Sequence, residues 1–147
     1  MAGVGGRESV LAERLDLLFE TVHPAGRGPY TLREAADAIN AEAGETIISA
    51  AYLSQLRNGK REEPSHSRLA AIARFFGVDV EYFSGSAPAA DAARQAEALA
   101  AMQDPGVRAI ALRARGLSEP SLAAVLAVIE NARRLENLPD PDLRPQR

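Results

Sequence analysis

Cysteine is absent from the 147 residues of this chain, which excludes disulfide bonds, thiolate metal sites and a cysteine nucleophile. A chain without cysteine is also typical of a reducing compartment. No apolar run approaches the roughly 20 residues that a membrane-spanning helix needs. Residues 1–7 are glycine-rich and lack the apolar stretch of a secretory signal. We therefore expect a cytoplasmic protein with no membrane partner.

Histidine is scarce too, and this argues against catalysis. The two histidines, His23 and His66, lie in or beside proline-containing loops. A serine beside His66 is not a catalytic triad, because the triad is defined by geometry and not by adjacency. The sequence has no metal-ligand spacing, phosphate-binding loop or dinucleotide fingerprint. We expect no enzyme activity, no metal site and no cofactor, and the sequence leaves a small-molecule effector undetermined.

Positive charge is in slight deficit, since the net charge is −3. A mildly acidic chain at first argues against a nucleic-acid partner, but the distribution of charge matters more than its sum. Residues 49–61 contain Arg57, Lys60 and Arg61 and no acidic residue. A local basic patch on a nearly neutral body is compatible with DNA binding, with weak non-specific affinity per monomer.

Apolar residues at helical spacing, interrupted by proline and glycine, predict an all-α protein. In the N-terminal part we expect helices over 8–22, 31–43, 50–58 and 65–77, followed by a short apolar segment that folds back on the core. Thr31 with Glu34 three residues later has the capping-box pattern of a helix start. Residues 8–84 are assigned to a helix-turn-helix domain and residues 85–90 to a linker.

The C-terminal part, residues 91–138, predicts a small helical dimerisation module with helices over 91–102, 105–115 and from Ser118 onward. Residues 139–147 are rich in proline and charge, and we expect a disordered tail. One face of the last helix is apolar, and the residues assigned there to the dimer interface are Leu122, Val125, Leu126 and Ile129. An apolar face of this size is expected at a dimer interface. Ordinary packing within the chain is the alternative for each residue.

The stretch from 31 to 67 is the most informative about function, because it contains a helix, a connection, a second helix, a basic turn and a further helix. In a helix-turn-helix protein the second helix of the pair lies in the major groove. Its expected outward positions, the candidates for base contact, are Ala50, Ala51, Tyr52, Ser54 and Gln55. Glutamine can bond adenine in bidentate fashion, and alanine or tyrosine can contact a thymine methyl.

Candidates for the DNA backbone surround this helix, because basic and polar groups there can contact phosphates. They are Arg57, Asn58, Lys60 and Arg61 at its end, with Thr31, Arg33 and Arg27 flanking the patch. Each residue taken singly has an ordinary alternative, a solvated helix face or a polar turn. The ordered set, with Leu53 and Leu56 turned inward, favours double-stranded DNA as the partner.

A protein–protein adaptor that keeps the fold without binding DNA is the competing hypothesis. Ala50, Ala51 and the acidic pair at 62–63 favour it slightly, as does the net negative charge. The basic turn at 57–61 counts against it.

The chain resembles the XRE/Cro type of helix-turn-helix protein (a lambda-repressor-like fold), and more narrowly the EspR-like nucleoid-associated transcriptional regulators. The resemblance covers about residues 11–138. The residues that carry it include Pro24, Gly26-Arg27-Gly28-Pro29, Tyr52-Leu53-Ser54-Gln55-Leu56-Arg57, Pro64-Ser65, Phe75-Phe76, Tyr82-Phe83 and Gly106-Val107-Arg108. The tyrosine block and the proline–glycine block are specific when they occur together.

The resemblance implies that Gln55 reads a base edge, that Asn58, Lys60 and Arg61 contact the DNA backbone, and that the C-terminal helices hold a homodimer. The chain departs from the usual pattern in two ways. Leu32 replaces a polar residue early in the second helix, so a phosphate contact would have to come from Thr31 or Arg33. The connection over 43–49 is longer than the usual tight turn, which leaves the entry angle of the third helix open.

Overall fold

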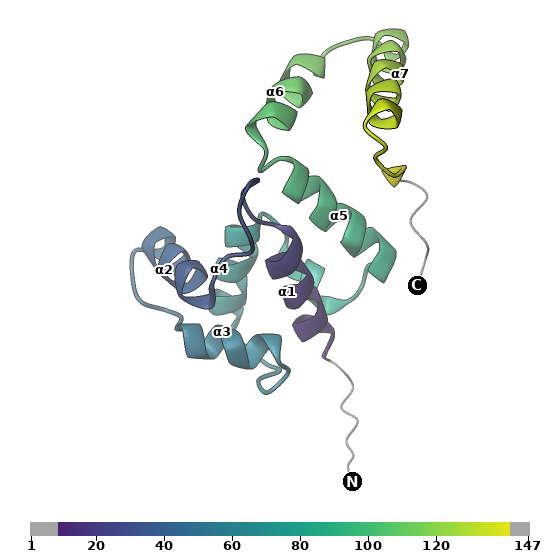
Figure 1. The fold of residues 1–147 in the computed structure, drawn as a ribbon. Helices are drawn as coiled ribbons and strands as arrows, with labels where there is room; N and C mark the ends of the chain where they lie inside the picture. The colour runs from purple at the N-terminus through teal and green to yellow at the C-terminus, as the bar shows by residue number, and fades with distance from the viewer. Residues whose placement is uncertain (1–8, 142–147) are drawn as a thin grey trace. The chain divides into compact units, whose positions relative to one another are not determined.

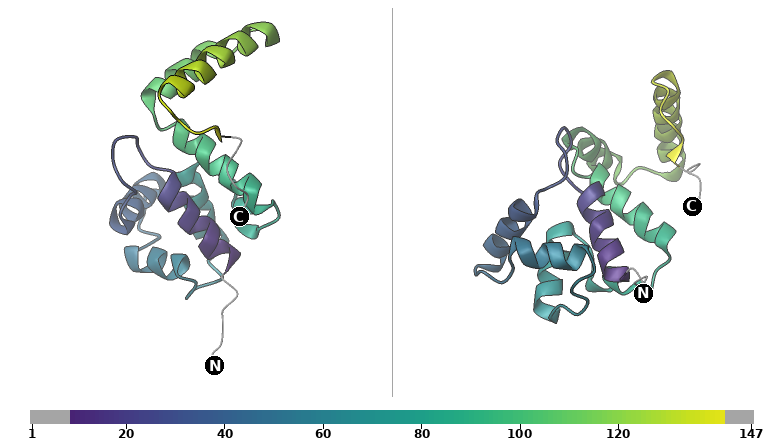
Figure 2. Two further views of the ribbon diagram at one scale, coloured as in Figure 1. Left: turned by 45° about the vertical axis from the view of Figure 1, so that its right-hand side comes forward. Right: turned by 60° about the horizontal axis from the view of Figure 1, so that its bottom comes forward.

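The computed structural model describes residues 9–141, and these residues form helices and no strands, which confirms the all-α prediction. They divide into two compact units, the first ending at Asp104 and the second beginning at Pro105. The first unit (Figures 1 and 2) contains α1 (Val10–Thr21), α2 (Leu32–Ala43), α3 (Ala50–Arg57), α4 (His66–Phe76), the short 3-10 helix η1 (Val80–Ser84) and α5 (Ala89–Ala101). The second contains α6 (Pro105–Ala114) and α7 (Glu119–Leu135). The expected tail over 139–147 lies mostly outside the described residues.

Hydroxyl side chains begin the helices that position the site. Thr31 and Glu34 form a reciprocal capping box at the start of α2, while Ser49 and Ser65 accept the N3 backbone N–H groups of α3 and α4. Each bond satisfies a donor that the first turn of a helix leaves without a partner. The α2 helix ends at Gly44, whose φ of 76° lies in the left-handed region that glycine adopts without steric cost.

One hydrophobic core holds the first unit together. Its fully buried side chains come from α1, α2, α3 and α4: Leu15, Leu18, Phe19, Ile39, Leu53, Leu56 and Ile72. Phe19 and Phe76 meet edge to face with ring centroids 5.1 Å apart. The core therefore fixes α3 against α1 and α2, and in Figure 1 α3 lies across the lower end of this unit.

The α5 helix packs beside α1 and belongs to the first unit (Figures 1 and 2). Ala92 and Ala96 are buried there, and the Tyr82 hydroxyl donates to the Ala92 carbonyl at 3.0 Å. The sequence predicts a linker at 85–90 and a C-terminal module that begins with this helix, whereas the first compact unit of the structure extends to Asp104. An alanine-rich helix gives little periodic signal, although its alanines allow the close approach to α1.

The second unit consists of α6 and α7 and has no buried residue in either helix. Ser118 caps α7, with Pro120 in its first turn as the sequence predicts. The predicted interface residues are exposed or half-buried, with Leu122 at 41%, Leu126 at 54% and Ile129 at 38% exposed. Val125 is half-buried. The apolar face of α7 is thus uncovered within its own unit.

Candidate nucleic-acid interface

Two leucines fix the orientation of α3. Leu53 and Leu56 are fully buried, and the Ser49 hydroxyl accepts the Tyr52 N–H at 3.0 Å. On the same helix Ala51 is exposed, while Ala50, Tyr52, Ser54 and Gln55 are half-buried. Because the core holds one face, the candidate base-contacting side chains lie on the remaining surface.

Asn40 organises the long connection between α2 and α3. Its Oδ1 accepts the backbone N–H groups of Ile47 and Ile48 at 2.9 and 3.0 Å, and its Nδ2 donates to the Ile48 carbonyl at 2.8 Å. One side chain thus bonds three main-chain groups of a segment that has no regular structure. The direction in which the chain enters α3, which the sequence leaves open, is fixed by these three hydrogen bonds and by burial of Ile48.

Aromatic, amide and guanidinium groups gather along α3, where Tyr52 is half-buried and packs against the core. The guanidinium carbons of Arg61 and Arg68 lie 4.9 and 5.1 Å from the centroid of the Tyr52 ring. The Nε of Arg61 donates to Gln55 Oε1 at 3.1 Å. We call Tyr52, Gln55, Asn58, Lys60, Arg61 and Arg68 the recognition surface. It combines stacking, hydrogen-bonding and positive groups from α3, from the turn that follows it and from the first turn of α4.

The turn after α3 displays two further polar side chains of this surface. Asn58 is exposed, and its Oδ1 accepts the backbone N–H of Lys60 at 3.0 Å. Gly59 has a φ of 79°, so the chain reverses here in a conformation that favours glycine. Among the described residues no side-chain partner holds the exposed Lys60 ammonium, which leaves its charge available.

Arg57 instead has partners inside the protein. Its Nη2 and Nε donate to Asp16 Oδ1 at 2.5 and 3.2 Å, and its guanidinium lies 4.6 Å from the centroid of the Phe19 ring. The side chain is only 27% exposed. The sequence alone presents Arg57, Lys60 and Arg61 as three available cations. In the structure the charge of Arg57 is already paired with the carboxylate of Asp16, 41 residues away.

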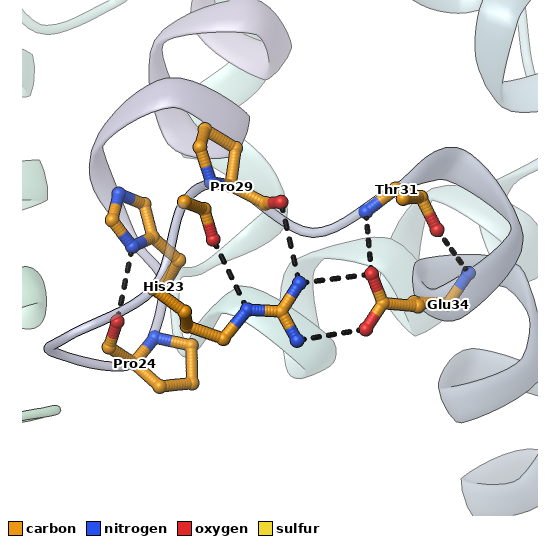
Figure 3. A network of polar contacts seen from close by, with 7 residues as sticks. His23, Pro24, Pro29, Thr31 and Glu34 are labelled. Atoms are coloured by element: carbon orange, nitrogen blue, oxygen red, sulfur yellow. Dashed lines mark hydrogen bonds and ion pairs between the residues drawn. The ribbon is translucent and has the colours of Figure 1, made fainter.

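Arg27 is likewise engaged, in the network of Figure 3. Its two terminal nitrogens donate to the two Glu34 oxygens at 2.8 and 2.9 Å, and it also bonds the carbonyls of Gly28 and Pro29. The Arg27 side chain, together with the Thr31 backbone N–H, lowers the pKa of Glu34 to about 2. The same pairing raises the pKa of Arg27. The network ties the 23–31 loop to the start of α2.

The remaining flanking candidates differ in exposure. Thr31 and Arg33 are exposed at the beginning of α2, whereas Leu32, the unusual residue of the pattern, is half-buried and packs against the core. No described residue holds the guanidinium of Arg33 in a hydrogen bond or ion pair. Of the two arginines predicted to flank the patch, Arg33 is the available one.

Sequence reasoning missed two residues that shape the site, Asn40 and Arg68. Arg68 donates from Nε to the Ile47 carbonyl at 2.8 Å, in addition to its contact with Tyr52. A signal for Arg68 was its place in the first turn of the helix that follows the basic turn. Asn40 precedes the unusually long connection by a few residues, but its three bonds depend on how that segment folds back.

Other kinds of site have little support in the described residues. No three histidine or acidic side chains come together in a way that could hold a metal ion. His23 contacts the Pro24 carbonyl at 3.1 Å through Nδ1, within the loop of Figure 3. Among residues 9–141, none of the helices has the length and apolar character that crossing a membrane requires.

Residues 30–83 match the helix-turn-helix family model, so the match covers α2, α3, α4 and all but the last residue of η1. The chain is also 42% identical over 130 residues to the "Nucleoid-associated protein EspR" of two strains of Mycobacterium tuberculosis, covering 88% of this chain and 97% of each relative. This protein belongs to the XRE-type helix-turn-helix proteins and, within them, to the EspR family. The resemblance expected from the sequence is confirmed.

Proposed function

We propose that this protein is a DNA-binding transcriptional regulator or nucleoid-associated protein that acts as a homodimer, with α3 in the major groove of double-stranded DNA. The observation that carries the proposal is the recognition surface around α3, a helix whose core-facing side is fixed by Leu53 and Leu56. The name of the M. tuberculosis relatives supports the same function and a location at the nucleoid in the cytoplasm. The protein is expected to have no catalytic activity.

Within this proposal Gln55 reads a base edge, with Ala50, Ala51, Tyr52 and Ser54 beside it. The DNA backbone is contacted by Thr31, Arg33, Asn58, Lys60 and Arg61, to which the structure adds Arg68. Arg27 and Arg57 keep their ion-pair partners within the chain, Glu34 and Asp16, and in this proposal they hold the 23–31 loop and α3 in place.

The homodimer forms through the apolar face of α7. Leu122, Leu126 and Ile129 recur at helical spacing on one face and lie exposed within their own unit. A second copy would cover this face symmetrically and place two α3 helices on one side of the duplex, about one turn or a multiple apart.

Titration of the isotope-labelled protein with duplex DNA tests the proposed interface. The backbone amides of 50–61 and the side-chain amide of Gln55 are expected to shift most. Chemical-shift changes confined to α6 and α7 would contradict the DNA proposal. So would the absence of any chemical-shift change at low salt. The second outcome would favour the protein–protein adaptor.

A further inference from the structure

We infer that Arg61 is a positioning residue, which fixes the direction of the Gln55 side-chain amide before DNA arrives and thereby sets base discrimination. The inference rests on the proposed function, in which Gln55 reads a base edge. It gives Arg61 a role in specificity beyond the phosphate contact that its charge alone suggests.

The turn after α3 attaches Arg61 to Gln55 twice. The backbone N–H of Arg61 donates to the Gln55 carbonyl at 3.1 Å, and the Arg61 Nε donates to Gln55 Oε1 at 3.1 Å. The guanidinium also lies over the Tyr52 ring, 4.9 Å from its centroid. Backbone, donor and stacking contacts together hold the Arg61 side chain in one position beside the reading residue.

The ring beneath Arg61 is itself held. The guanidinium carbon of Arg68 lies 5.1 Å from the centroid of the Tyr52 ring, and the Arg68 Nε donates to the Ile47 carbonyl. Arg68 thus links the ring to α4 and to the connection before α3. A planar guanidinium stacks on an aromatic ring and donates in a fixed direction, which an ammonium on a flexible stem does not. The arrangement therefore depends on arginine at 61.

The chemistry of the two groups determines the direction of the amide. A guanidinium has only donors, so the Gln55 amide must turn its oxygen toward Arg61, because the reversed amide would oppose N–H to N–H. Oε1 keeps a second lone pair and Nε2 keeps two hydrogens. An acceptor and a donor thus remain in a fixed order, and adenine offers the complementary pair at N6–H₂ and N7. Without Arg61 the last torsion of glutamine is broad and two-fold, and both orders become available.

The test measures discrimination at one base pair. The parent chain first selects its preferred duplex from a random pool, and the base pair read by Gln55 is found by comparing Gln55→Ala across single substitutions of that duplex. The ratio of dissociation constants for the substituted and preferred duplexes is then measured for Arg61→Ala and Lys60→Ala. These two variants lose the same charge from neighbouring positions in one turn.

We expect Arg61→Ala to reduce this ratio nearly as far as Gln55→Ala does. The full contact is worth roughly 5- to 150-fold, the equivalent of about 1–3 kcal/mol. Lys60→Ala should weaken binding to all duplexes alike and keep the parent ratio. Arg61→Lys should keep the parent salt dependence and lose discrimination. Adding Arg61→Ala to Gln55→Ala should reduce the ratio no further.

A parent-like ratio in Arg61→Ala, with the ratio lost in Gln55→Ala, would overturn the inference and leave the proposed function standing. An unchanged ratio in Gln55→Ala would overturn the assignment of Gln55 and the inference with it. Magnetic resonance of the Gln55 side-chain amide in the protein without DNA depends on neither of these binding ratios. The amide signals should move toward those of a free glutamine in Arg61→Ala and stay in place in Lys60→Ala. Parent-like amide signals in a folded Arg61→Ala variant would also overturn the inference.

Discussion

Truncation of Leu126 to alanine should weaken the proposed homodimer without unfolding α7. Leu126 is 54% exposed, so about half of its apolar surface remains to be covered by a second copy. Full burial of a leucine is worth about 1.5–3 kcal/mol, which leaves about 1 kcal/mol per copy. A two-fold interface uses each residue twice, so the dimer should lose about 2 kcal/mol, a roughly 30-fold rise in its dissociation constant.

Val128→Ala provides the control, because Val128 is 70% exposed but lies about 200° around the helix from Leu126. Alanine is the best helix former, so neither variant should lose helicity. Sedimentation equilibrium over a range of concentrations gives both dissociation constants. A monomeric parent chain at micromolar concentration would refute the dimer. A dimer weakened by Val128→Ala and not by Leu126→Ala would refute the assigned face.

Three further predictions concern the first unit. Arg57→Ala should lower the free energy of unfolding by about 1 kcal/mol in denaturant melts, because it removes the ion pair with Asp16 and a cation–π contact. The same variant should leave the salt dependence of DNA binding unchanged in binding isotherms. Glu34→Gln should remove a pH-dependent part of the free energy of unfolding. Because the pKa of Glu34 is about 2 in the folded protein against an ordinary 4.5, the carboxylate stabilises the fold above about pH 4.5 and loses this effect as the pH falls toward 2. Melts of the parent and the variant should therefore converge near pH 2. Gly59→Ala should cost about 1–2 kcal/mol because its φ is +79°, whereas Gly28→Ala, at a position outside the left-handed region and with open space around it, should cost nothing in the same melts.

Much of the first unit could be predicted from local sequence signals. Thr31, Ser49 and Ser65 begin helices as hydroxyl caps do, and the buried faces follow the apolar spacing of the helices. Such signals act over a single turn, so they are readable without knowledge of the fold. The same spacing predicts that Leu53 and Leu56 face the core and that Gln55 lies on the accessible side of α3.

The electrostatic state of the site could not be predicted in the same way. Arg57 pairs with Asp16 across 41 residues of sequence, and Arg68 reaches back to Ile47. These contacts depend on how α1, α3 and α4 pack together, so counting charges overestimates the cations available to DNA. The compact unit also extends further than the domain predicted over 8–84, because α5 packs against α1 only in the folded structure.

The dependence of duplex DNA affinity on salt concentration tests whether DNA binds at the recognition surface. We would compare the parent chain with Lys60→Ala/Arg61→Ala and with the charge-matched Arg74→Ala/Arg94→Ala, which removes two positive charges outside the recognition surface. We expect the affinity of the parent chain to fall steeply with salt. The slope of log K against log[salt] should be smaller by about 1.8 in the first double variant and unchanged in the second. A parent chain that binds no duplex at low ionic strength, or equal slopes in both double variants, would contradict DNA binding through α3.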